Sequence, residues 1–153
     1  MNIRETLYFK QVDLLLNILP LISRIEDFAL KGGTAINLFV QDFQRLSVDI
    51  DLAYLPIQDR KTTLKRIDSH LKEIGVRCQK YLPGVELNYK EKHNLSYGLI
   101  VHREETVIKI EPNSTIRGSV FPAITLPLAK KVEEMFERTM EIRTLSVEDL
   151  YGG

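Results

Sequence analysis

Hydrophobic positions in this chain follow a helical spacing in two stretches and alternate with polar positions in a third. Residues 5–25 carry apolar side chains near one stripe, which predicts a core-facing helix or helix pair, and Pro20 is expected to break or kink it. Residues 59–74 repeat the helical spacing and are followed by Gly75, a residue that commonly ends a helix. Residues 48–54 alternate, which predicts a short strand.

Residues 76–112 change to strand-like segments with the sequences VRCQKYL, VELNYKEK, SYGLIVH and TVIKIEP. Their alternation and short connections predict hairpins, antiparallel in arrangement, that extend the sheet begun by residues 28–31 and 48–54. Beyond them, residues 114–127 are expected to be a loop or an extended stretch, and residues 128–140 are expected to be a helix.

The last residues, LSVEDLYGG, place Ser146 three positions before Asp149. This spacing resembles a capping box and predicts the start of a further helix. That helix would stop within about two turns, so we expect a chain that is cut short. The elements together predict an α+β (mixed α/β) fold, with a mixed or antiparallel sheet flanked by helices. We expect one domain over residues 1–153, with a catalytic core at 28–112 and a C-terminal helical part at 126–153.

Composition narrows the classes of protein that fit this pattern. The chain has 153 residues, and its charges balance to a formal net charge of zero. A neutral chain does not bind nucleic acid through bulk electrostatics, so such a contact must come from a local patch. The single cysteine, Cys78, excludes an internal disulfide, suits a reducing cytoplasm, and is interpreted as a buried structural thiol. No apolar run approaches the ~20 residues of a membrane helix, so we expect a cytoplasmic protein.

A Gly-Gly pair lies between a predicted strand and a predicted short helix in FALKGGTAINLF. Gly32 and Gly33 would form the turn, and Thr34 would cap the helix. Such a turn lets a phosphate approach the backbone, where the free N–H groups of the helix start bind it. A Gly-Gly pair before a helix is usually just a turn, so the motif alone favours that alternative.

Two aspartates share one face of the alternating stretch VDIDLAY. Asp49 and Asp51 would lie roughly 7 Å apart along the strand. Two like charges this close repel unless a cation lies between them, and hard divalent cations such as Mg²⁺ prefer oxygen ligands. The alternative is a solvated strand face. Because Asp is uncommon in strands, we favour a metal site.

A third carboxylate follows in the last predicted strand, TVIKIEP, where Glu111 and Lys109 share one face. If that strand lies beside the aspartate strand, Glu111 would join Asp49 and Asp51 at the metal, and Lys109 could reach a phosphate. An ordinary charge pair on a strand is an equally good explanation of these two residues.

The segments KGGTAINLF, RLSVDIDL, IKIEPN and LSVEDLYGG together resemble the AbiEii/AbiGii toxin family of nucleotidyltransferases. That family belongs to the polymerase-beta-like superfamily, whose pattern is a Gly-Gly or Gly-Ser turn, a short helix and an Asp-x-Asp strand. The resemblance covers essentially the whole chain, and the combined motif is more specific than any one segment. It implies the polymerase-beta-like fold and an enzyme that moves a nucleotide from a nucleoside triphosphate (NTP) to an acceptor, which is tRNA in related toxins.

The resemblance also implies roles for individual residues. Asp49, Asp51 and Glu111 would be catalytic and would bind two Mg²⁺ ions. The residues implied to bind the nucleotide or its phosphates, together with Lys109, are Lys31, Gly32, Gly33, Thr34, Arg45 and Ser47. Family members are generally the toxin half of a two-gene toxin–antitoxin system in phage abortive infection. The resemblance therefore implies an AbiEi-like antitoxin, encoded nearby, as a partner.

Two other functions remain open on the sequence. A small-molecule nucleotidyltransferase would use the same site with a different acceptor. Family chains continue past the DLYGG region with a lysine and an Arg-Asp-containing helical segment that contributes to the site, and this sequence lacks those positions. The second alternative is therefore a non-catalytic binding module that forms a homodimer through its last helix.

Overall fold

The computed structural model describes residues 7–31, 49–117 and 123–146. These residues form three helices and seven strands. In chain order the elements are α1 (Leu7–Ser23), β1 (Phe28–Lys31), β2 (Asp49–Tyr54), α3 (Arg60–Tyr81), β3 (Val85–Lys92), β4 (Leu95–Arg103), β5 (Thr106–Arg117), β6 (Ile124–Pro127), α4 (Lys130–Phe136) and β7 (Glu141–Thr144). None of the described helices combines the length and the apolar character needed to cross a membrane.

All seven strands belong to one mixed sheet, in the order β3-β4-β5-β2-β1-β7-β6. The pairs β2–β5 and β1–β7 are parallel, and the other neighbouring strands are antiparallel. The predicted α+β fold with a mixed sheet is therefore confirmed, as is the antiparallel arrangement of β3, β4 and β5. The aspartate strand, β2, lies in the middle of the sheet between β1 and β5.

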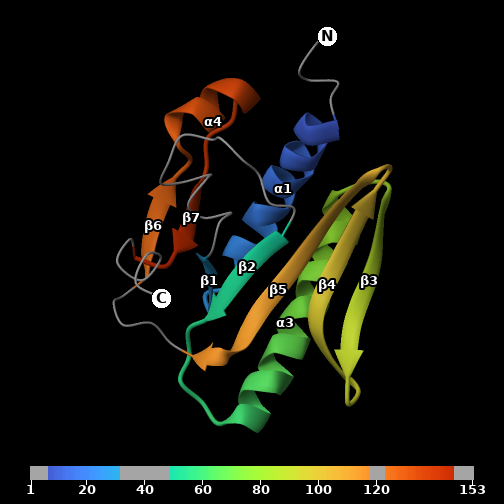
Figure 1. Ribbon diagram of the computed structural model, residues 1–153, viewed down its shortest axis with the longest axis vertical. Coiled ribbons are helices and arrows are strands. Elements are labelled where there is room, and N and C mark those ends of the chain that lie inside the picture. The colour runs from blue at the N-terminus through green and yellow to red at the C-terminus, as the bar shows by residue number, and fades with distance from the viewer. Residues whose placement is uncertain (1–6, 32–48, 118–122, 147–153) are drawn as a thin grey trace.

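The helices pack on one face of this sheet. Ile50 and Tyr54 of β2 point into the same hydrophobic core as Leu15 of α1 and Ile67 of α3, and α4 adds Val132 to it. Figure 1 shows α1 and α3 behind the sheet, with the opposite face of β2 and β5 turned towards the viewer. None of the three described helices covers that opposite face, which we call the open face.

The first helix, α1, runs without interruption through Pro20, so the predicted break is wrong. Pro20 is exposed, whereas its neighbours Leu19 and Leu21 are buried in the core. Most of the stability of a helix in a protein comes from burying its apolar face. Here that burial outweighs the backbone hydrogen bond that proline cannot donate.

The long helix α3 continues past Gly75, so both the predicted helix end there and the predicted strand at residues 76–82 are wrong. The apolar stripe extends beyond the glycine, with Ile74 and Cys78 both fully buried. A Cβ atom on Gly75 would overlap the hydroxyl of Tyr89 on β3. Glycine therefore serves the close approach of the helix to the sheet and does not end the helix.

The C-terminal part contains two strands, one in the stretch predicted to be a loop or extended and one in the part predicted to be helical. β6 lies within residues 114–127, and β7 follows α4. α4 is shorter than the helix predicted over residues 128–140, because it ends at Glu137, whose φ of 51° is left-handed. The part 126–153 is therefore not wholly helical. The helix predicted to start at Ser146 lies outside the described residues.

Candidate active site

β2 presents Asp49 and Asp51 on the open face of the sheet. Ile50 and Leu52, which alternate with them, are buried against the helices. Because successive side chains of a strand point to opposite faces, the aspartates point away from the helices. Both aspartates are half-buried. They share one face of one strand, as the alternation predicts.

The strands on either side of β2 bring further charged residues to the same face. In the parallel β2–β5 pair, Asp51 lies opposite Glu111, and Asp49 lies opposite Lys109. In the antiparallel β1–β2 pair, Asp51 lies opposite Lys31. Residues that lie opposite each other share a face, and neighbouring strands are about 4.8 Å apart. Lys31, Asp51 and Glu111 thus form a row across β1, β2 and β5.

Asp51, in the middle of this row, has a perturbed carboxyl group. Burial raises the pKa of Asp51, and the nearby carboxylates of Asp49 and Glu111 raise it further, whereas Lys31 opposes the shift. Each of these two carboxylates affects the pKa of Asp51 more than Lys31 does, so the negative charge around Asp51 exceeds what that lysine offsets. Such an arrangement favours the binding of a cation.

Lys90 is a charged neighbour of the site that the sequence analysis did not single out. Its Nζ atom, carried by β3, lies 3.1 Å from Oε1 of Glu111 on β5. β4 runs between these two strands, and the residue of β4 opposite Lys90 is Gly98. A Cβ atom on Gly98 would lie 3.2 Å from Cδ of Lys90. The absence of a side chain at Gly98 therefore opens the path by which Lys90 crosses β4.

A sequence signal for Lys90 exists, but it can be used only once the strand register is known. Gly98 interrupts the strand SYGLIVH, and a glycine inside a strand often marks the close approach of another group. Only the pairing of β3 with β4 identifies that group as Lys90. The hydrogen bond to Glu111 raises the pKa of the Lys90 ammonium group, so this lysine is charged at neutral pH.

The three predicted metal ligands offer the right chemistry for a hard cation but do not converge on one point. Within the described ranges, no three His, Cys, Asp or Glu side chains are grouped so that they could hold a metal ion. Glu111 is instead paired with Lys90. Carboxylate oxygens in matching register on neighbouring strands suit Mg²⁺. A cation that used all three carboxylates would have to displace Lys90 from Glu111.

The predicted site residues divide into two groups. Those in the described part of the chain lie together on the open face, and they are Lys31, Asp49, Asp51, Lys109 and Glu111. The others lie outside the described residues, and they are Gly32, Gly33, Thr34, Arg45 and Ser47. The Gly-Gly pair follows directly on Lys31 in the sequence, where β1 ends.

Comparison with known families identifies the family of this chain. The family model described as "Nucleotidyl transferase AbiEii toxin, Type IV TA system" matches residues 13–153. The match includes β1, β2 and β5, and hence every described residue of the candidate site. No curated protein matches the chain.

Proposed function

Because this chain belongs to the AbiEii family of nucleotidyl transferase toxins of type IV toxin–antitoxin systems, we propose that it transfers a nucleotide from an NTP to an acceptor hydroxyl in a Mg²⁺-dependent reaction. We propose tRNA as the acceptor. The observation that carries the proposal is the row of Lys31, Asp51 and Glu111 across three neighbouring strands, with Asp49 beside it. This row combines anionic ligands for a cation with a cationic group for a phosphate.

Each residue of the site has a role in this proposal. Asp49, Asp51 and Glu111 would hold Mg²⁺, which would supply Lewis-acid chemistry to the triphosphate and the acceptor hydroxyl. Asp51 or Glu111 accepts the proton that the acceptor hydroxyl releases. Lys31 and Lys109, on the same face, direct charge-assisted hydrogen bonds at phosphate oxygens. From the family resemblance, Gly32, Gly33 and Thr34 would bind phosphate through backbone N–H groups, and Arg45 and Ser47 would be near the phosphates.

A transfer assay tests the proposal. The protein is incubated with Mg²⁺, each labelled NTP in turn, and total tRNA. We expect label on tRNA with the wild-type protein and only background label with Asp49→Asn and Asp51→Asn, because each change removes a charged oxygen ligand. Glu134→Gln, which alters an exposed carboxylate on α4, is the control and should keep full activity. Unchanged turnover in either aspartate variant would show that the site is wrongly assigned.

The same assay distinguishes a wrong acceptor from a wrong reaction. Label on small hydroxyl compounds but not on tRNA would show that the proposed acceptor is wrong and that the proposed transfer reaction is right. If no acceptor is labelled and no Mg²⁺-dependent NTP binding is detected, the reaction itself is wrong and the non-catalytic module is favoured.

The cellular partner follows from the same family. We propose that an AbiEi-like antitoxin encoded nearby counteracts this protein and that the pair acts in the cytoplasm in phage defence. The family description supports an antitoxin in general terms. Expression of the wild-type chain should arrest growth, expression of Asp51→Asn should not, and the neighbouring gene should restore growth. Equal arrest by both forms would contradict the link between toxicity and the carboxylates.

A further inference from the structure

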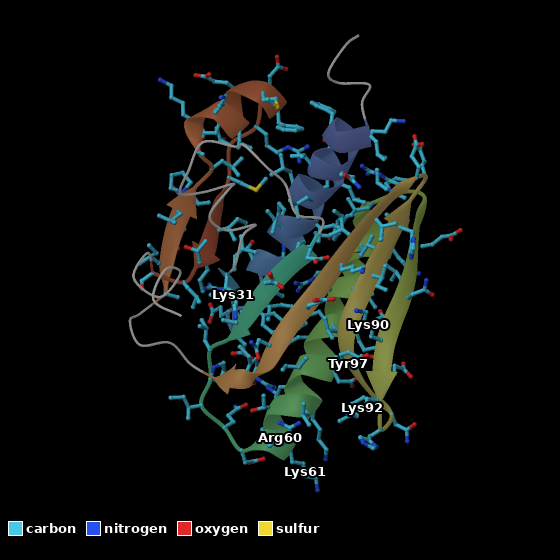
Figure 2. The ribbon with its side chains drawn as sticks, viewed as in Figure 1. Lys31, Arg60, Lys61, Lys90, Lys92 and Tyr97 are labelled. Carbon is cyan, nitrogen blue, oxygen red and sulfur yellow. The ribbon has the colours of Figure 1, made fainter. Side chains whose placement is uncertain are left out.

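A cleft of about 590 Å³ lies between the first turn of α3 and the hairpin that joins β3 to β4. Its volume is within the range of small-ligand sites and suits a single nucleotide. Arg60 lines it from the helix, and Lys92, His93 and Tyr97 line it from the hairpin. Figure 2 shows Arg60, Lys92 and Tyr97 at this end of the molecule.

The side chains of the cleft match the chemistry of a nucleotide. Arg60 and Lys92 are exposed cations, and none of the described residues that line the cleft is acidic. Asp59, the neighbour of Arg60, accepts a hydrogen bond from the Thr62 N–H at 2.8 Å and caps the helix. Tyr97 has 48% of its surface exposed, so its ring offers a face on which a base can stack.

The charge of the cleft is local. The chain as a whole has a formal net charge of zero, so its surface does not attract polyanions in general. Two cations and an exposed aromatic ring in one cleft are the combination found in sites for single-stranded nucleic acid.

The cleft is connected to the candidate active site through β4 and β3. Tyr97 precedes Gly98, the residue over which Lys90 reaches Glu111. Tyr97 is therefore adjacent in the chain to the point at which Lys90 reaches Glu111, one of the carboxylates of the candidate site.

The cleft and Lys31 lie on opposite sides of those carboxylates. In the sheet, β3 and β4 are on one side of β5 and β2, and β1 is on the other. In phosphoryl transfer the attacking hydroxyl and the leaving group are roughly in line, on opposite sides of the phosphorus. If the triphosphate is held near Lys31, the side of the carboxylates that faces β4 remains available for the acceptor.

We propose that the cleft binds an unpaired nucleotide of a single-stranded acceptor RNA, with its base on Tyr97 and its phosphate between Arg60 and Lys92. The strand then passes Lys90 and reaches the carboxylates from the β3 side. This role of the cleft, binding the acceptor RNA, rests on the proposed nucleotidyl transfer. Its occupancy can be tested independently, because RNA binding can be measured without transfer.

Fluorescence anisotropy with a labelled single-stranded RNA of about 12 nucleotides, in the absence of Mg²⁺ and NTP, measures this binding. Arg60→Glu with Lys92→Glu should weaken it at least about tenfold. The slope of log affinity against log salt should fall by about 0.7, the contribution of the single phosphate that lies between these two side chains. Lys130→Glu with Lys131→Glu reverses two exposed charges on α4, away from α3 (Figure 1), and should change affinity by less than about twofold.

Substitutions of Tyr97 test the stacking. Tyr97→Ala should weaken RNA binding about tenfold, because it removes the stacking surface, whereas Tyr97→Phe keeps the ring and should stay within about twofold of wild type. Thermal unfolding of each variant, with a midpoint equal to that of wild type, shows that the fold is intact.

Several outcomes would overturn the proposal. These are the absence of RNA binding by the wild-type protein, an equal loss of RNA affinity in both double variants, and equal affinity for single-stranded and duplex RNA. Binding of a free nucleoside monophosphate as tight as that of the RNA would also overturn it, because the ligand would then be a free nucleotide. A protein that binds RNA through the cleft but labels no acceptor would contradict the proposed function and leave the cleft in place.

Discussion

At the proposed metal site, Lys90 would compete with a divalent cation for the carboxylate of Glu111. The ammonium group lies 3.1 Å from Oε1 of Glu111 and supplies positive charge next to the acidic row. A cation that binds Glu111 brings positive charge to the same place, so the two positive groups exclude each other. We therefore expect Lys90 to weaken the binding of a metal ion at the proposed site.

Lys90→Met should increase the affinity of the protein for Mn²⁺ or Mg²⁺ by roughly twofold to fivefold, the range expected for a partly exposed ion pair. The rise in melting temperature with metal concentration measures this affinity. Lys92→Met, on the same strand, removes an equal charge that has no ion pair with Glu111, and it should leave the affinity unchanged. Weaker metal binding by Lys90→Met would mean that the lysine supports the metal and does not compete with it.

Asp51 makes stability depend on pH in the absence of metal. Its folded-state pKa is raised above the ordinary value of 3.8, so the folded state holds the proton more tightly than the unfolded state. The stability gained from protonated Asp51 is present below the ordinary pKa and is lost as the pH rises through the raised one. In a chelating buffer at pH 7, Asp51→Asn should therefore raise the melting temperature, by about 2 °C.

The same variant should respond differently to metal. Mn²⁺ should raise the melting temperature of the wild-type protein and have little effect on Asp51→Asn, since the amide carries no charge. Glu134→Gln, an exposed site on α4, should behave as wild type in both buffers. A melting temperature for Asp51→Asn that is below that of wild type at pH 7 would contradict the sign of the shift.

Among the elements, α3 depends most on contacts from a distant part of the sequence. Its glycine, Gly75, packs against Tyr89 and Leu87 of β3. Alanine at this position would gain about 1 kcal/mol of helix propensity. It would also overlap the tyrosine ring, and overpacking of this kind costs about 1–3 kcal/mol. The two effects oppose each other, and the steric one is the larger.

Gly75→Ala should therefore destabilise the protein, by about 1 kcal/mol in urea unfolding. In a Tyr89→Ala background the obstacle is gone, and the same Gly75→Ala change should stabilise the protein by up to about 1 kcal/mol. The reversal of sign is the test. If Gly75→Ala has the same sign in both backgrounds, contact with Tyr89 does not explain the glycine.

Most strands were predictable because their burial follows the local pattern. In β2 and β5 the buried residues Ile50, Leu52, Ile108 and Ile110 alternate with polar ones, and this alternation survives in the folded sheet. The face shared by Asp49 and Asp51 follows from the same period. The predicted place of Glu111 beside them needed the additional condition that β5 pairs with β2, which the sheet fulfils.

The elements that were mispredicted depend on partners far along the chain. The strand β7 has only four residues, too few for a recognisable alternation, and it is fixed by its parallel pairing with β1. There the Leu145 N–H donates to the Leu30 carbonyl at 3.0 Å. Glycine commonly ends a helix, but the contact with Tyr89 determines the role of Gly75. Local sequence carries no information about either contact.

For the whole molecule, the core is continuous from α1 across the sheet to α4. Cys78 is completely buried in it, and burial raises the pKa of its thiol to about 11. A thiol reagent can therefore reach a reactive thiolate only when the core opens. The interpretation of this residue as a buried structural thiol is confirmed.

Labelling of Cys78 at pH 8 should consequently be slow in the folded protein and rapid in urea. Its rate should rise in Gly75→Ala by the same factor as the equilibrium constant for unfolding, because both report the opening of the same core. Mass spectrometry after timed labelling provides the measurement. Labelling of the native protein as fast as that of the unfolded chain would show that the thiol is accessible.

The parallel pairing of β2 with β5 also determines when the acidic row comes into being. Between these strands the chain must complete α3, β3 and β4, and domains of a growing chain fold only as their residues emerge from the ribosome. Asp49 and Asp51 are therefore synthesised before Glu111, and the row cannot form until Glu111 has been added. A chain whose synthesis stops before β5 carries both aspartates and no assembled row, so unfinished copies of this toxin are released without the site that we assign to its activity.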